Sequence, residues 1–124
     1  MIKFKSLNQS SQFLKILKKK KISTKYFTIF FDKNFSSIKN NNNNNNILNI
    51  SFVMKKNIGN AVTRNRIKRK LKAAVHKIIK KKQDIDLNYT YVIFGRNNVY
   101  KDKFPLIFSE INNVFKRIKL MEAQ

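Results

Sequence analysis

The residues best suited to chemistry lie between Gly59 and Lys72. Three of the five arginines of the chain, Arg64, Arg66 and Arg69, fall within this segment, although lysine is by far the commoner cation. Arginine binds a phosphate through two parallel hydrogen bonds and stacks on bases, which lysine does not do. A helix that begins here would add free N–H groups for another phosphate. The segment predicts contacts with a polyanion, and the alternative is a basic helix face that only meets solvent.

The charge of the whole chain supports the same interpretation. The 124 residues include 28 Lys and Arg but only 6 Asp and Glu, for a formal net charge of +22, and the stretch from Lys55 to Lys82 contains no acid. Self-repulsion on this scale destabilises a compact protein unless a polyanion neutralises it. Nucleic acid is the partner that we favour over the alternative, an anionic membrane surface.

Aromatic residues suggest a second candidate site. Phe13 in a predicted helix, with Tyr26 and Phe30 in a predicted strand, can line one groove. Aromatic rings stack on unpaired bases without needing a particular sequence. The alternative for these three residues is plain core packing.

Few residues are available for protein-based catalysis. The chain has no Cys, which excludes disulfides, zinc–thiolate sites and thiol chemistry. Its one histidine, His76, has no evident group to orient it as a base. A two-metal nuclease needs several converging carboxylates, whereas the six acids are dispersed: Asp32, Asp84, Asp86, Asp102, Glu110 and Glu122. Neither a membrane span nor a secretion signal is evident, so we expect a cytoplasmic protein without a membrane partner.

Apolar periodicity predicts the elements that must position these residues. We expect a helix over residues 6–21, capped by Ser10 or Ser11, and strands over residues 25–32 and 47–54. In the first strand, Phe27, Ile29 and Phe31 face one way, and Tyr26, Thr28 and Phe30 face the other. The Asn-rich residues 36–46, with an unbroken run from Asn40 to Asn46, predict a disordered insertion in a hairpin.

The second half of the chain is predicted to form two helices and one strand. A turn over residues 55–60 contains Gly59, and the next helix, residues 61–82, has a stripe formed by Ile67, Leu71, Ala74, Val75 and Ile78. A strand over residues 89–94 ends at Gly95. The last helix, residues 104–120, would bury Leu106, Ile107, Ile111, Val114, Phe115 and Ile118. The order α-β-β-α-β-α predicts a two-layer α+β sandwich, as one domain over residues 1–124 with its core at about 5–118.

The basic segment also resembles a known family. Gly59-Asn60-Ala61-Val62, followed by Arg64-Asn65-Arg66-Ile67-Lys68-Arg69, is similar to the signature of the bacterial ribonuclease P protein component. Phe13 within Ser11-Gln12-Phe13-Leu14-Lys15 and the sequence Phe94-Gly95-Arg96 extend the resemblance, which covers about residues 5–118.

The resemblance implies a ribosomal-protein-like fold with an unusual left-handed βαβ crossover. It also implies an RNA-binding subunit of an endoribonuclease, in which a catalytic RNA removes the 5′ leader of precursor tRNA with Mg²⁺ held by the RNA. The partners would be that RNA and the leader, and the oligomeric state stays open. Implied RNA contacts are Lys55, Lys56, Asn60, Arg64, Asn65, Arg66, Lys68, Arg69 and Lys72. The implied leader cleft consists of Phe13, Leu17, Tyr26 and Phe30.

Two alternatives of other classes follow from the residues. One is a stand-alone RNA- or DNA-binding protein of ribosomal or nucleoid type, for which the charge alone would suffice. The other is a protein that catalyses hydrolysis itself, against which the scattered acids argue.

Overall fold

The computed structural model describes residues 2–7, 9–33, 47–81 and 85–123. The predicted Asn-rich insertion, residues 36–46, lies outside these residues and stays a prediction. Five strands form one sheet in the order β1-β4-β5-β3-β2. The strands are β1 (Lys3–Lys5), β2 (Lys20–Ser23), β3 (Phe27–Lys33), β4 (Ile47–Val53) and β5 (Tyr89–Gly95). The helices are α1 (Ser10–Ile16), α2 (Ala61–Lys80), α3 (Asn98–Lys101) and α4 (Phe104–Ala123), with a 3₁₀ turn, η1, at Lys56–Ile58.

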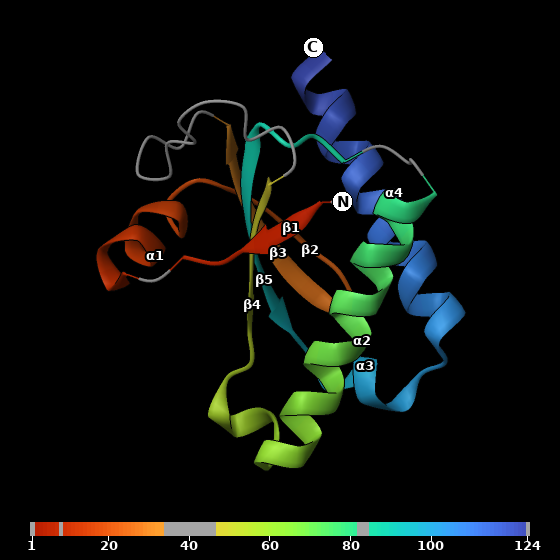
Figure 1. Cartoon of the computed structure of the whole chain (residues 1–124). Helices are drawn as coiled ribbons and strands as arrows, with labels where there is room; N and C mark the ends of the chain where they lie inside the picture. Colours follow the sequence, from red (N-terminus) through yellow and green to blue (C-terminus); the bar gives the residue numbers. More distant parts are fainter. Residues whose placement is uncertain (1, 8, 34–46, 82–84, 124) are drawn as a thin grey trace.

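The helices divide unequally between the two faces of the sheet (Figure 1). Helices α2 and α4 cover one face, and the short α1 lies on the other. The main core fills the space beneath α2 and α4, where the predicted α2 stripe and the inward side of β3 are buried. The predicted α+β class is confirmed, but α1 adds a partial third layer to the predicted two.

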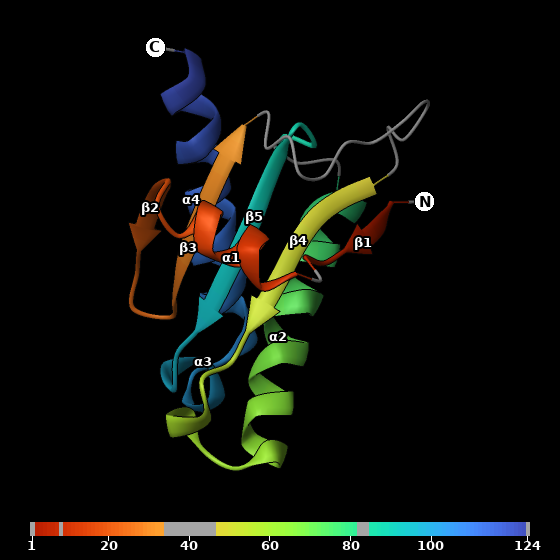
Figure 2. The same cartoon turned by 90° about the vertical axis from the view of Figure 1, so that its left-hand side faces the viewer.

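The crossover between β4 and β5 is left-handed. Both strands are parallel neighbours, and α2 connects them. Seen from the α1 side in Figure 2, both strands run down the view, β5 lies to the left of β4, and α2 lies behind the sheet. Almost all such connections are right-handed, so the feature that the family resemblance implied is present. It leaves α2 beside the β1–β4 edge of the sheet.

The predicted helix over residues 6–21 is wrong in extent. Helix α1 covers only Ser10–Ile16, and its N-cap is Gln9 without a side-chain hydrogen bond, so neither Ser10 nor Ser11 caps it. Residues 20–23 instead form edge strand β2, in which Ile22 is buried opposite Ile29. Consecutive lysines repel one another on a helix, whereas an edge strand keeps them in water and blocks further pairing.

Three smaller differences concern two short elements and one residue of α4. Strand β1 and helix α3 were not predicted, because each is too short to show periodicity. Leu106 is 55% exposed, not part of the buried face of α4. The other five residues predicted for that face are buried.

The face under α1 is only partly covered, because α1 has two turns. Leu7, Ile16 and Val92 form a small buried cluster there, and several larger rings pack against it while staying half-exposed. These rings are Phe13, Phe30 and Phe94. A sheet face with half-exposed aromatic rings can accept a ligand, so the α1 face of the sheet is a candidate binding surface.

Candidate nucleic-acid interface

The start of α2 is set by Gly59 and Asn60. Gly59 has a φ of 155°, and a Cβ there would lie 3.2 Å from the side chain of Thr63. Asn60 is the N-cap, and its side-chain oxygen accepts a hydrogen bond from the Thr63 N–H at 2.9 Å. The oxygen of Asn60, a predicted RNA contact, is therefore engaged in holding the helix.

The basic residues predicted to contact RNA lie on or just before α2. Lys55, Lys56, Asn65, Arg66, Lys68 and Arg69 are exposed, and Arg64 and Lys72 are half-buried. The Arg66 guanidinium lies 5.9 Å from the ring centroid of Tyr100, and its Nη1 is 3.4 Å from the hydroxyl. Tyr100, on α3, is 42% exposed. Helix α3 thus adds an aromatic ring to the basic surface, and sequence periodicity gave no sign of it.

Lys70, in contrast, binds backbone carbonyls at the end of α3. Its ammonium donates to the carbonyl oxygens of Val99 and Asp102 at 3.0 Å and of Tyr100 at 3.3 Å. A cation at the C-terminus of a helix satisfies carbonyls that have no partner in the helix. Lys70 therefore joins α2 to the end of α3.

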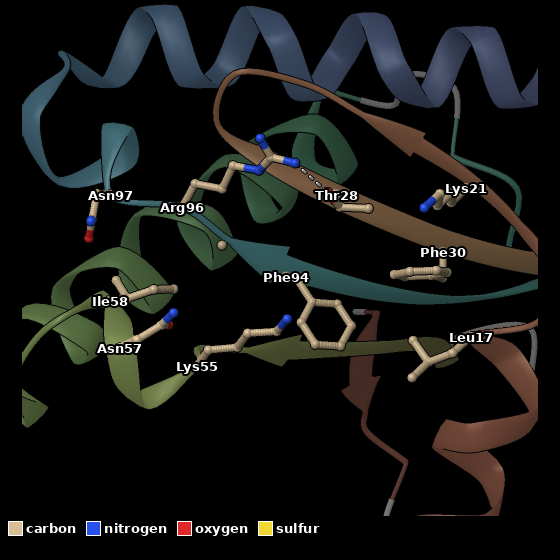
Figure 3. Close-up of a pocket in the computed structure, with 11 residues that line it drawn as sticks. Leu17, Lys21, Thr28, Phe30, Lys55, Asn57, Ile58, Phe94, Arg96 and Asn97 are labelled. Atoms are coloured by element: carbon tan, nitrogen blue, oxygen red, sulfur yellow. Dashed lines mark hydrogen bonds between the residues drawn. The ribbon is translucent and has the colours of Figure 1, made fainter.

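A cleft of about 570 Å³ opens between α1, η1 and the sheet (Figure 3). We call it the sheet cleft; the residues that line it are Leu17, Lys21, Thr28, Phe30, Lys55, Asn57, Ile58, Phe94, Gly95, Arg96 and Asn97. None of these residues is acidic. The cleft combines aromatic rings with cations and amides, which suits a single-stranded nucleic acid.

Aromatic rings and cations are paired within the sheet cleft. Phe30 and Phe94 meet edge to face with ring centroids 5.6 Å apart. The ammonium of Lys21 lies 5.9 Å from the centroid of Phe30, and that of Lys55 lies 5.6 Å from the centroid of Phe94. Arg96 donates to the hydroxyl of Thr28 at 2.9 Å. The rings can stack on bases while the cations contact the phosphates between them.

The four residues predicted for the leader cleft do not all line the sheet cleft. Leu17 and Phe30 line it. Phe13 packs against the same small cluster as Phe30 but lines a second, smaller pocket. Phe94, Lys21 and Arg96 were missed, although Phe94 shares its sheet face with Val92 by simple alternation.

The prediction that Tyr26 points with Phe30 is wrong, because Tyr26 is buried in the main core with 4% exposure. Strand β3 begins only at Phe27. The Thr24 hydroxyl accepts hydrogen bonds from the N–H groups of Tyr26 and Phe27, at 3.2 and 3.1 Å. This turn precedes the strand, so the alternation of β3 does not extend to Tyr26.

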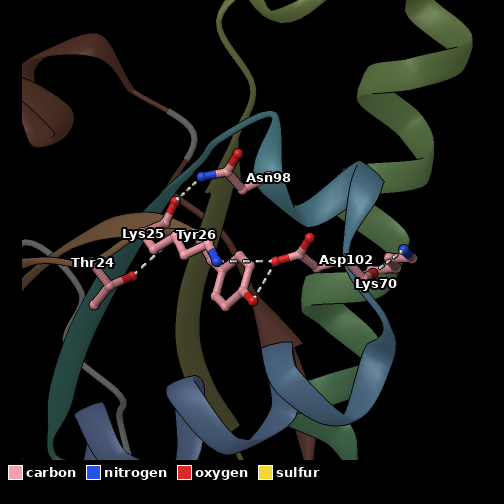
Figure 4. Close-up of polar contacts among 6 residues, drawn as sticks. All are labelled: Thr24, Lys25, Tyr26, Lys70, Asn98 and Asp102. Carbon is pink, nitrogen blue, oxygen red and sulfur yellow. Dashed lines mark hydrogen bonds and ion pairs between the residues drawn. The ribbon is translucent and has the colours of Figure 1, made fainter.

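Tyr26 holds the segment that follows β5 (Figure 4). Its hydroxyl donates to Asp102 at 2.6 Å, and Lys25 lies 3.4 Å from the same carboxylate oxygen. The Asn98 side chain donates to the Lys25 carbonyl at 3.0 Å, and the Arg96 N–H donates to the Tyr26 carbonyl at 2.9 Å. These contacts fix the position from which Arg96 reaches the sheet cleft.

The same hydrogen bond changes two pKa values. It raises the pKa of Tyr26 to about 12, with burial as the second cause. It also lowers the pKa of Asp102, with Lys25 adding to the effect. The Asp102 carboxylate therefore stabilises the fold above its ordinary pKa of 3.8, and this stabilisation is lost as the pH falls through the lowered pKa. The Tyr26 phenol acts in the opposite sense: its stabilisation is complete below pH 10 and is lost as the pH rises through about 12.

Within the described residues, none of the helices combines the length and the hydropathy of a membrane span. The same part of the chain holds no group of three or more His, Cys, Asp or Glu that could bind a metal ion.

The chain is similar to known proteins over nearly its whole length. A model of the family described as Ribonuclease P matches residues 1–119. The ribonuclease P protein component of Mesomycoplasma hyopneumoniae strain 7448 is 29% identical over 123 residues, covering 98% of this chain and 99% of that protein. The same component of Carboxydothermus hydrogenoformans is 27% identical over 120 residues, covering 96% and 95%.

Solved structures share the fold. The RNase P protein of Staphylococcus aureus superposes with a TM-score of 0.66 at 21% identity, covering 92% of this chain and 94% of that one. The RNase P protein from Thermotoga maritima gives a TM-score of 0.65 at 22% identity, covering 91% and 96%.

Replacing Tyr26 tests the tie to Asp102. We expect Tyr26→Phe to lower the free energy of unfolding by about 1 kcal/mol near neutral pH, the usual contribution of one hydrogen bond. The deficit should shrink as acid protonates Asp102. Urea unfolding over a pH series measures it, with Tyr100→Phe as the matched control, since that hydroxyl does not contact Asp102. A deficit of equal size at every pH would show that the bond does not depend on the carboxylate charge.

Proposed function

This chain belongs to the ribonuclease P protein family, and we propose that it is the RNA-binding protein subunit of ribonuclease P. In this role it helps a catalytic RNA to remove the 5′ leader from precursor tRNA. The observation that carries the proposal is the family match over residues 1–119, which includes both the basic helix and the sheet cleft. Membership favours this function over a stand-alone RNA- or DNA-binding protein. The proposal includes a cytoplasmic location.

We propose that the N-terminal half of α2 binds the catalytic RNA. Arg66 and Arg69 are exposed there, and Arg64 is half-buried beside them. Arginine forks bind phosphates through paired hydrogen bonds. The Arg66 fork is held beside the Tyr100 ring, which limits the entropy lost when a phosphate binds. Lys55 and Lys56 extend the basic surface toward the sheet cleft.

We propose that the sheet cleft binds the single-stranded leader. Its volume of about 570 Å³ exceeds what one base needs. The two rings, Phe30 and Phe94, offer stacking surfaces, and Lys21, Lys55 and Arg96 offer charge on either side of them. Such contacts are tolerant of sequence, which fits a subunit that must handle many leaders.

We assign the hydrolysis to the RNA and not to this protein. Among the described residues, no group of acids converges to hold a metal ion. Asp102 is engaged by Tyr26 and Lys25, and the Asp86 carboxylate accepts a hydrogen bond from the Asn88 N–H at 2.9 Å. The described residues therefore do not fit a protein-held Mg²⁺. What the protein contributes is positive charge and a position for the leader.

Reconstitution with the catalytic RNA tests this division of labour. The protein alone should not cleave precursor tRNA, and protein with RNA should cleave it at the leader junction. Replacing each of the six acids by its amide, one at a time, should leave the rate within about a few-fold, because no carboxylate takes part in the chemistry. Cleavage by the protein alone, or a loss of several orders of magnitude in one amide variant, would contradict the proposal.

The leader cleft has its own test. Phe30→Leu and Phe94→Leu should each weaken binding of precursor tRNA to the holoenzyme by roughly 5- to 100-fold, as expected for the loss of base stacking. Binding of mature tRNA, which lacks the leader, should change little. Phe108→Leu on α4 is the matched control, because it removes a half-buried ring on the other side of the sheet. Equal losses for both RNAs would point to general destabilisation.

A further inference from the structure

A second pocket lies at the β4 edge of the sheet, beyond the end of β1. Strand β1 pairs with Ile47, Leu48 and Asn49, and among the described residues no strand pairs with the later part of β4 on that side (Figure 2). The chain leaves β1 and turns across the sheet, where the Leu7 N–H donates to the Ser51 hydroxyl at 2.8 Å. The resulting space of about 290 Å³ is the β4-edge pocket, lined among others by Phe4, Phe13, Ser51, Phe52, Lys68 and Lys72.

The aromatic rings of this pocket are half-buried and form part of a stack. Phe4 lies parallel to His76, with centroids 4.1 Å apart and an angle of 7° between the planes. Phe52 lies 6.2 Å from Phe4 at 26°. Phe13 approaches from α1. Three rings that keep part of their surface exposed around a small space are suited to holding one more flat group.

The charge of the pocket comes from two lysines, one turn apart on α2. Neither Lys68 nor Lys72 has a hydrogen bond or an ion pair within the described part of the chain. None of the described residues that line the pocket is acidic. Two ammonium groups beside half-buried rings can bind a phosphate next to a stacked base.

We propose that the β4-edge pocket binds one unpaired nucleotide of the catalytic RNA. Its size is near the lower limit of about 300 Å³ for ligand pockets, which suits one nucleotide and not a strand. The base must be unpaired, because a base within a duplex has both faces covered by its neighbours. The pocket would then give the protein a specific position on an RNA that its charge alone would bind loosely.

The geometry favours the catalytic RNA over the leader as the source of this nucleotide. The pocket and the sheet cleft share no lining residue: Phe13 lines the pocket, and Leu17, one helical turn further along the chain, lines the cleft. Lys68 and Lys72 belong to the helix that we assign to the catalytic RNA. This inference rests on the proposed function, because it needs the catalytic RNA to be the partner of α2.

Binding of the catalytic RNA, without precursor tRNA, tests the proposal. Phe52→Leu and Phe13→Leu should each weaken binding by roughly 5- to 100-fold. Phe52→Tyr, which keeps an aromatic ring, should retain most of the wild-type affinity. Lys72→Gln should weaken binding and reduce the slope of log affinity against log salt by about 0.7 to 0.9. Phe108→Leu and Lys116→Gln, on α4, are the matched controls. Melting curves select a temperature at which every variant is folded.

Ultraviolet crosslinking of the assembled holoenzyme identifies the occupant. We expect crosslinked peptides containing Phe13 or Phe52 joined to one unpaired nucleotide of the catalytic RNA. Leucine variants that bind like the wild type, or crosslinks of these rings to the leader, would overturn the proposal while leaving the proposed function intact. Failure of the wild-type protein to bind the catalytic RNA at all would instead overturn the proposed function.

Discussion

Twenty-eight cationic side chains share this chain with six carboxyl groups, so most of the cations cannot be neutralised within the fold. No described Lys or Arg is fully buried, and the two buried clusters consist of apolar and aromatic side chains. Charges that have no internal partner must stay in water, where they repel one another over about 10 Å at moderate salt. Binding a polyanion removes this repulsion. The charge therefore lowers the stability of the free protein and favours its binding to RNA.

Two features of the fold determine where these charges and the exposed rings lie. The left-handed crossover places α2 beside the β1–β4 edge, where Lys68 and Lys72 line a pocket. The shortness of α1 leaves Phe30 and Phe94 half-exposed on the opposite face of the sheet. The two proposed binding regions therefore have separate linings, one at the β4 edge and one on the α1 face of the sheet. Lys70, Tyr26 and Asp102 line neither region. They hold the segment around α3 against α2 and the turn before β3.

Much of this arrangement could be predicted from the sequence, where the signal is local. The stripe of α2 and the inward face of β3 follow from spacing, because regular elements repeat their burial. Short elements carry no such period, and so β1, α3 and the change from α1 to β2 were missed or misread. Tyr26 was misplaced for the same reason: a turn at Thr24 interrupts the alternation before β3 begins. In the sequence, Lys70 cannot be told apart from the neighbouring basic residues, because the carbonyls that it contacts lie about thirty residues further along the chain.

In the proposed function, the protein supplies charge and position while the RNA supplies the chemistry. The most direct measurement is the cleavage rate of precursor tRNA with and without the protein, over a range of Mg²⁺ and salt concentrations. If the protein acts by neutralising phosphates, its benefit is largest at low Mg²⁺, and high Mg²⁺ partly replaces it, since both place positive charge between two RNAs. A benefit that is the same at every Mg²⁺ concentration would contradict this role of the protein.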